Sequence, residues 1–275
     1  MTAFRTIEIS DPALTPAGLR FVTVKSAALG QRADILLFVP RQAEGRRDLP
    51  LVTLLHGVYG SHWAWAFKGG AHLTAQRLID EAAIPPMVLA MPSDGLWGDG
   101  SGYVPHHGPS PQDFERWIVD EVPAATRLAC AACSAASPQF IAGLSMGGFG
   151  ALRLAGLYPH RFAAAAGLSS VTDAAQFDAL LQEPRSGWSS AAAHRSVLAA
   201  LSAAPIQNLP PLRLVCGRDD PYIHDNRALH AALTAAGIAH DYAEHEGGHE
   251  WAFWQHHLED TLRFFARQLP AAGRA

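Results

Sequence analysis

The chain has 275 residues, of which 49% are hydrophobic and 17% are charged, which is enough apolar material for one large α/β domain around a buried sheet. Its net charge of -4 and its pI of about 6.4 exclude a strongly basic nucleic-acid-binding protein. No apolar run approaches the roughly 20 residues of a membrane span, and the first residues carry no apolar signal region. We therefore expect no membrane partner and a cytoplasmic location, although a processed secreted form is also compatible with this sequence.

The first third of the chain is expected to begin a sheet with antiparallel strands. Residues 6–9, 19–24 and 33–39 are short alternating or apolar runs with proline and glycine between them. Residues 50–55 follow as a continuous apolar run, which is typical of a buried strand.

Strands and helices then alternate along the chain. We expect further strands at residues 86–92, 139–142, 162–168, 212–216 and 240–245, and helices at residues 73–83, 114–128, 150–157, 226–236 and 251–268. The helix at 114–128 should be broken or bent at Pro123. This alternation predicts an α/β fold with a mostly parallel central sheet and helices on both faces.

No linker or internal repeat divides the chain, so we expect a single domain over residues 1–275. Residues 169–205 are less regular and rich in alanine and serine, and we expect this segment, called the cap segment below, to lie over the carboxyl edge of the sheet. The residues from Pro270 onward are expected to fray.

The stretch Gly143-Leu144-Ser145-Met146-Gly147 matches the nucleophile-elbow pattern G-x-S-x-G. A serine at a sharp turn between a strand and a helix has a strained backbone and an exposed hydroxyl, and glycines two positions away avoid collisions with neighbouring chain. The motif alone is also compatible with an ordinary glycine turn. Its place between an apolar run and a helical segment favours the elbow.

Acyl transfer needs a base for the serine and a carboxylate to orient that base, in the chain order Ser, acid, His. After Ser145, a strand ends in Asp219 and Asp220, and a later glycine loop carries His249. We predict Ser145, Asp220 and His249 as the catalytic residues, with Asp219 as the alternative acid. The glycine pair before His249 would let its loop approach the elbow.

An oxyanion hole needs two backbone N–H groups. The first should belong to Met146, directly after the serine. The second should come from the loop His56-Gly57-Val58-Tyr59-Gly60, where we favour Val58, with Gly57 as the alternative. His56 is expected to tether this loop.

Aromatic side chains near the predicted site loops suggest an apolar acyl or aryl pocket, although each one could instead pack beneath a loop. The pocket candidates are Tyr59, Trp63, Trp97, Tyr103, Trp188 and Trp251, with Trp65 close to them in sequence.

The three cysteines do not indicate a disulfide framework, and they favour a reducing compartment. Cys130 and Cys133 form a C-x-x-C motif, but no second pair of ligands accompanies it, so we interpret the pair as structural. His245 and His249 are four residues apart, but Gly247 and Gly248 between them argue against a helical metal pair, and His249-Glu250 lacks the second histidine of an H-E-x-x-H motif. We expect no metal and no cofactor.

Together these motifs resemble the esterase family that contains esterase D, also called S-formylglutathione hydrolase, the tributyrin esterases, the feruloyl and acetylxylan esterases, and the mycolyltransferases. The matching blocks are residues 54–63, 91–95, 140–159, 216–220 and 247–251 with Trp254. The resemblance implies an α/β-hydrolase fold, no metal, and hydrolysis of carboxylic esters through an acyl-enzyme. It also implies that Ser145, Asp220 and His249 form the triad and that Val58 and Met146 form the oxyanion hole.

The resulting hypothesis is a serine carboxylesterase for short-chain or aryl esters, most similar to the bacterial tributyrin-esterase type. The alternatives within the family are an acyltransferase and an esterase for S-formylglutathione, feruloyl or acetylxylan substrates, although no glutathione-thioester signature is found. A binding protein that keeps the hydrolase fold without catalysis is a further alternative, which the intact Ser-Asp-His set disfavours. The expected partner is a small-molecule ester, and the sequence is compatible with a homo-oligomer.

Overall fold

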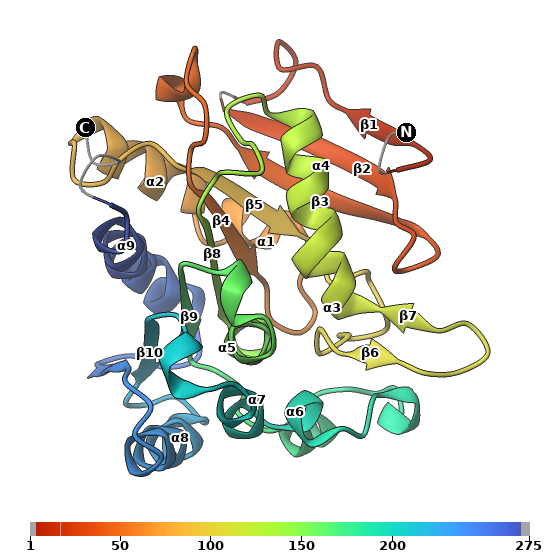
Figure 1. The fold of residues 1–275 in the computed structure, drawn as a ribbon, viewed down its shortest axis with the longest axis vertical. Coiled ribbons are helices and arrows are strands. Elements are labelled where there is room, and N and C mark those ends of the chain that lie inside the picture. The colour runs from red at the N-terminus through yellow and green to blue at the C-terminus, as the bar shows by residue number, and fades with distance from the viewer. Residues whose placement is uncertain (1–3, 17, 271–275) are drawn as a thin grey trace.

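The computed structural model describes residues 4–16 and 18–270 of the chain, so the expected fraying after Pro270 lies outside the described residues. Within the described part, the strands form a nine-stranded sheet in the order β1-β2-β3-β5-β4-β8-β9-β10-β11, and β6 and β7 form a separate pair (Figure 1). The strands are β1 (Ile7–Ile9), β2 (Leu19–Lys25), β3 (Arg32–Phe38), β4 (Leu51–Leu55), β5 (Val88–Pro92), β6 (Pro105–His106), β7 (Gln112–Asp113), β8 (Gln139–Leu144), β9 (Ala164–Leu168), β10 (Leu212–Gly217) and β11 (Asp241–His245).

The sheet begins antiparallel and continues parallel. Strands β1, β2, β3 and β5 pair antiparallel in turn, whereas β5, β4, β8, β9, β10 and β11 all pair parallel. The central strands β4, β5 and β9 are buried at every position, as continuous apolar runs require when helices cover both faces. The predicted mostly parallel sheet with an antiparallel N-terminal start is confirmed.

Helices cover both faces of the sheet, as predicted (Figure 1). Side chains of α4, α5, α7 and α8 pack in the core on one face, and those of α1, α2 and α9 pack in the core on the other. The helices are α1 (Ala64–Phe67), α2 (Ala71–Asp80), α3 (Phe114–Arg116), α4 (Val122–Ala129), α5 (Met146–Leu157), α6 (Ala192–Arg195), α7 (Val197–Ala203), α8 (Ile223–Ala235) and α9 (Trp251–Arg267).

The two-residue period of the strands divides these cores. Within β4, Leu51 and Leu55 belong to the first core, whereas Val52 and Leu54 belong to the second. The catalytic candidates therefore lie at the end of a sheet that is anchored from both sides.

Of the two outcomes predicted at Pro123, a break or a bend in the helix after β7, the break is wrong and the bend stays a prediction. Helical structure continues from α3 through a π-helical turn (Trp117–Glu121) into α4, so the chain does not break there. A proline cannot donate to the carbonyl four residues earlier, which here belongs to Val119. That carbonyl accepts a hydrogen bond from Arg161 Nη2 at 2.6 Å instead, so the missing backbone bond is replaced.

The cap segment contains only short helices, namely 3-10 turns at Ala174–Ala179 and Arg185–Gly187 followed by α6 and α7. The single-domain boundary and the role of this segment as a cap stay predictions. Among the described residues, no helix combines the length and the apolar character needed to cross a membrane.

Candidate active site

The elbow serine lies between β8 and α5 in a strained backbone conformation. Ser145 has φ 54° and ψ -119°, a region that L-residues rarely occupy. A Cβ atom added to Gly143 would lie 2.2 Å from the Gly147 carbonyl oxygen, and one added to Gly147 would lie 2.2 Å from the Leu55 carbonyl oxygen. Both glycines are therefore required by the close approach of the neighbouring backbone.

Three residues from separate loops meet at this turn. The Nδ1 atom of His249 lies 2.9 Å from Asp220 Oδ2, and its Nε2 atom lies 3.1 Å from Ser145 Oγ. Because an ionised carboxylate only accepts hydrogen bonds, Nδ1–H donates to Asp220. The Nε2 atom then accepts from the Ser145 hydroxyl, which is the arrangement a general base needs.

The two candidate acids have different surroundings. Asp220 is 2% exposed, and its Oδ1 accepts a hydrogen bond from the Tyr222 N–H at 2.9 Å. The side chain of Asp219 is exposed, and its backbone N–H donates to Gly247 O at 3.1 Å. The structure therefore brings Asp220, and not Asp219, to His249.

The approach of the histidine loop depends on a further glycine. A Cβ atom on Gly217, the last residue of β10, would lie 2.1 Å from the Gly247 carbonyl oxygen. Gly247 itself has φ 119°. These two positions let the loop after β11 lie directly against the end of β10, which places His249 beside Asp220.

The loop after β4 is held by buried polar contacts. The Nδ1–H of His56 donates to Gly57 O at 2.7 Å, and its Nε2 atom accepts from the Asp94 N–H at 3.0 Å. Asp94 accepts in turn from the N–H groups of Leu96 and Ser101, at 3.0 Å and 2.7 Å. The predicted tethering role of His56 matches these contacts.

Two backbone N–H groups beside the serine are available for an oxyanion. Within the described residues, neither the Val58 nor the Met146 N–H has a hydrogen-bond acceptor. The side chains of both residues lie beside Gly100, where an added Cβ would be 2.6 Å from Met146 Sδ and 3.4 Å from Val58 Cγ1. The amide of Met146 is also the first of helix α5, where the helix dipole favours negative charge.

A cavity of about 380 Å³ opens above Ser145 and His249. Three of the predicted pocket residues, Tyr59, Trp63 and Trp251, line it. Four further lining residues were not among the predicted pocket residues, namely Lys68, Leu180, Tyr222 and Trp254. Of these, Trp254 stands within a matching sequence block, and Tyr222 follows Asp220 by two positions, which is the one local signal available.

The other predicted pocket aromatics lie outside this cavity. Trp188 of the cap segment stacks on His106, with ring centroids 5.3 Å apart, and Trp97 packs edge-on against the same histidine at 4.5 Å. Tyr103 is fully buried and donates from its hydroxyl to His56 O at 3.0 Å, so it supports the loop after β4 instead of lining the pocket. Trp65 is buried beneath Trp251.

The environment of the histidine is aromatic on two sides. Tyr222 and Trp254 both pack edge-on against His249, at centroid distances of 5.2 Å and 4.9 Å. Burial, and next the charge of Asp220, raise the pKa of Tyr222, so this phenol stays neutral near the site.

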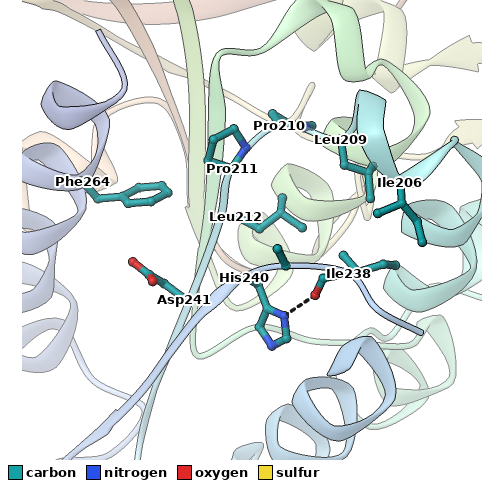
Figure 2. A pocket seen from close by; sticks show the side chains of 10 residues that line it. Ile206, Leu209, Pro210, Pro211, Leu212, Ile238, His240, Asp241 and Phe264 are labelled. Carbon is teal, nitrogen blue, oxygen red and sulfur yellow. Dashed lines mark hydrogen bonds between the residues drawn. The ribbon is translucent and has the colours of Figure 1, made fainter. Parts of the chain in front are cut away.

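A second cavity of about 440 Å³ lies at the opposite edge of the sheet, where β10 and β11 begin (Figure 2). Its lining includes Leu212 and Asp241 from the first positions of these strands and Phe264 from α9. Ligands of parallel sheets bind at the carboxyl ends of the strands, where Ser145 lies. This cavity lies at the amino ends and is therefore separate from the candidate active site.

The C-x-x-C pair is separate from the site. Cys130 and Cys133 are both buried thiols at the end of α4, and a hydrogen bond from Cys133 lowers the pKa of Cys130 to about 6. Among the described residues, no group of three or more His, Cys, Asp or Glu side chains could hold a metal ion.

Comparison with known proteins places this geometry in a family. Residues 26–265 match the sequence model of the family described as "Putative esterase". An acetyl esterase of Caldicellulosiruptor saccharolyticus is 27% identical over 236 residues, covering 80% of this chain and 84% of that relative.

Solved structures have the same fold. The fluorophosphonate-binding serine hydrolase FphF of Staphylococcus aureus superimposes with a TM-score of 0.77 at 21% identity, covering 92% of this chain and 99% of that one. A ferulic acid esterase superimposes with a TM-score of 0.76 at 21% identity, covering 96% of this chain and 100% of that one. The chain therefore belongs to the esterase family, the carboxylic ester hydrolases of the α/β-hydrolase fold that its sequence motifs resemble.

Proposed function

We propose that this enzyme hydrolyses short-chain or aryl carboxylic esters through an acyl-enzyme on Ser145. The observation that carries the proposal is the unbroken hydrogen-bond chain from Asp220 through His249 to Ser145, at 2.9 Å and 3.1 Å, below an aromatic cavity. The named substrates of the relatives, an acetyl ester and a ferulic acid ester, fit this class.

In the first half-reaction, Ser145 Oγ attacks the ester carbonyl carbon while its proton moves to His249 Nε2. The negative charge that forms on the carbonyl oxygen is stabilised by the N–H groups of Val58 and Met146. Asp220 stabilises the imidazolium and keeps its ring oriented. The intermediate then collapses, the alkoxide leaves with the proton from Nε2, and the acyl group stays on Ser145.

In the second half-reaction, a water molecule gives its proton to His249 Nε2 and attacks the acyl carbonyl. The same two N–H groups hold the oxyanion, and the bond to Ser145 Oγ breaks as the oxygen regains its proton. The products are a carboxylic acid and an unchanged enzyme.

The cavity supports small ester substrates. Its volume of about 380 Å³ falls in the lower part of the usual range of small-molecule sites, and Tyr59, Trp63 and Trp251 give it aromatic walls. Short acyl chains and aryl groups fill such a space, whereas a long lipid chain would extend beyond it.

The replacement Ser145→Ala tests the proposal. We expect hydrolysis of 4-nitrophenyl acetate to fall by about 10⁶-fold, because the nucleophile is removed. A fluorophosphonate probe should label the native protein and not the variant. Circular dichroism and thermal unfolding check that the variant is folded. Retention of native activity by a folded variant would contradict the proposed role of Ser145.

A further inference from the structure

A single lysine lines the cavity of the candidate active site. Lys68 follows helix α1, where its backbone N–H donates to Ala64 O at 2.9 Å. Its Nζ atom lies 5.7 Å from the ring centroid of Trp251, above the ring. Lysine is rare in this chain, which contains only Lys25 and Lys68.

The surface beneath this ammonium group consists of packed aromatic rings. Trp251 packs edge-on against Trp65 and Trp254, at centroid distances of 5.7 Å and 5.4 Å. A Cβ atom added to Gly69 would lie 2.8 Å from the Trp251 ring, so the backbone next to Lys68 also touches it. The ring centroid of Trp254 in turn lies 4.9 Å from that of His249. The rings of Trp251 and Trp254 therefore lie between Lys68 and the proposed base.

The charge of Lys68 has no counterpart at the site. Among the described residues, Lys68 forms no ion pair, although nine of the arginine side chains do, including Arg77 and Arg227 near the surface. The described residues that line the cavity include no aspartate or glutamate. Of these described residues, Lys68 is thus the one lining residue of this cavity that carries a permanent charge.

We infer that Lys68 forms an anion subsite of the ester pocket and that the preferred substrates are esters carrying a carboxylate. This inference rests on the proposed ester hydrolysis at Ser145. A carboxylate separated from the ester by a few bonds would reach Nζ while the ester carbonyl lies between Ser145 and the two N–H groups. The ring of Trp251 would contact the apolar part between the two polar ends.

The expected contribution is to binding. An exposed ammonium group attracts a carboxylate by an amount that corresponds to a change of up to about fivefold in affinity, and salt screens this attraction. The interaction is the same in the ground state and the transition state because the carboxylate does not react. It should therefore lower KM and leave kcat nearly the same.

The experiment compares matched ester pairs that differ in charge. One pair is mono-4-nitrophenyl glutarate and 4-nitrophenyl butyrate, with the charge on the acyl side. The other is 4-acetoxybenzoate and methyl 4-acetoxybenzoate, with the charge on the alcohol side. For each pair, the ratio of kcat/KM for the anionic ester to that for the neutral ester is measured with the native enzyme, Lys68→Met and Lys68→Glu.

We expect the ratio for at least one pair to fall about fivefold in Lys68→Met and further in Lys68→Glu. The cause should be a higher KM for the anionic ester, with kcat nearly unchanged. The pair that responds identifies the side of the ester that faces Lys68. Raising the salt concentration to 0.5 M should reduce the native ratio and leave that of Lys68→Met unchanged.

The matched control is Lys25→Met. Lys25 lies at the end of β2, outside the cavity, and its Nζ donates to Gly30 O at 2.6 Å, so its replacement should leave both ratios unchanged. Ratios that stay at the native value in both Lys68 variants would overturn the anion subsite while leaving ester hydrolysis intact. Failure of the proposed function would appear differently, as an absence of Ser145-dependent hydrolysis of the neutral esters.

Discussion

Two consecutive aspartates follow β10, and the fold gives them different environments. Asp220 is buried and bonded to His249, whereas Asp219 faces solvent and takes part in the site only through its backbone N–H. The turn after Gly217 causes this difference, because successive side chains in a tight turn point in different directions. The pair therefore offers an internal comparison for the proposed triad.

We expect Asp220→Asn to reduce kcat by about 10⁴-fold, because an amide can hold the imidazole in the tautomer that cannot accept the serine proton. The variant Asp219→Asn, one position away, should stay within about twofold of the native rate. Steady-state hydrolysis of 4-nitrophenyl acetate measures both. Equal losses in the two variants would contradict the assignment of Asp220.

The sequence predicts the site residues that belong to motifs, but not those whose place at the site depends on tertiary contacts. Ser145 and His249 could be selected because chain order and glycine spacing limit the choices. Lys68 carries no motif, since its place at the site depends on α1 packing beside the first residue of α9. The prediction of Trp97, Tyr103 and Trp188 as pocket residues is wrong, because the sequence of a loop does not reveal whether its aromatic residues face a cavity or the core.

Among the secondary-structure elements, the strands were the most predictable, because uninterrupted apolar runs such as residues 88–92 have few alternatives in a chain of this size. Helix α1 is four residues long, too short for any periodic pattern to appear. The sequence could not decide between a break and a bend at Pro123 either, since Arg161 supplies the compensating donor from 38 positions further along the chain.

The cap segment is joined to the loop before α3 through His106. Its ring stacks on Trp188, and its Nε2–H donates to Ser101 O at 3.0 Å. Burial lowers the pKa of His106 to about 4 from its usual 6.5. Between these values the unfolded chain binds a proton that the folded protein does not, so stability is fully present above pH 6.5 and falls as the pH drops toward 4.

We expect His106 to account for about 3 kcal/mol of stability lost between pH 6.5 and 4, and His106→Gln to remove that part of the pH dependence. Urea unfolding at several pH values gives the slope of the free energy of unfolding against pH for each protein. A general loss of stability in the variant does not change this slope and so does not obscure the result. An exposed histidine outside this region provides the control, since His224→Gln should leave the pH dependence of stability as it is in the native protein. A native slope in His106→Gln would show that other groups cause the acid sensitivity.

A buried ion pair joins α5, the helix that follows Ser145, to other parts of the fold. Arg153 of α5 lies 3.0 Å from Glu115 of α3, with side chains 0% and 3% exposed, and its Nη2 donates to Tyr103 O at 2.9 Å. Glu115 also accepts from the Tyr158 hydroxyl and lies 3.2 Å from His194 of α6. Burial lowers the pKa of Arg153, while the charge of Glu115 opposes that effect.

We expect Arg153→Met to lower the free energy of unfolding by about 4 kcal/mol, because Glu115 is then buried without its cation. The double replacement Arg153→Met with Glu115→Leu should recover much of this loss, since no unpaired charge remains. Urea denaturation of the native protein and the two variants measures the difference. A double variant no more stable than the single one would show that the wider hydrogen-bond network, and not the pair, dominates.

The positive φ of Ser145 has a consequence for protein engineering. Glycine adopts this backbone conformation without strain, so a sequence optimised for thermal stability alone would favour glycine at position 145. It would then remove the hydroxyl on which the proposed chemistry depends. Any stabilisation of this enzyme by design therefore has to hold position 145 fixed and seek its gains elsewhere in the fold.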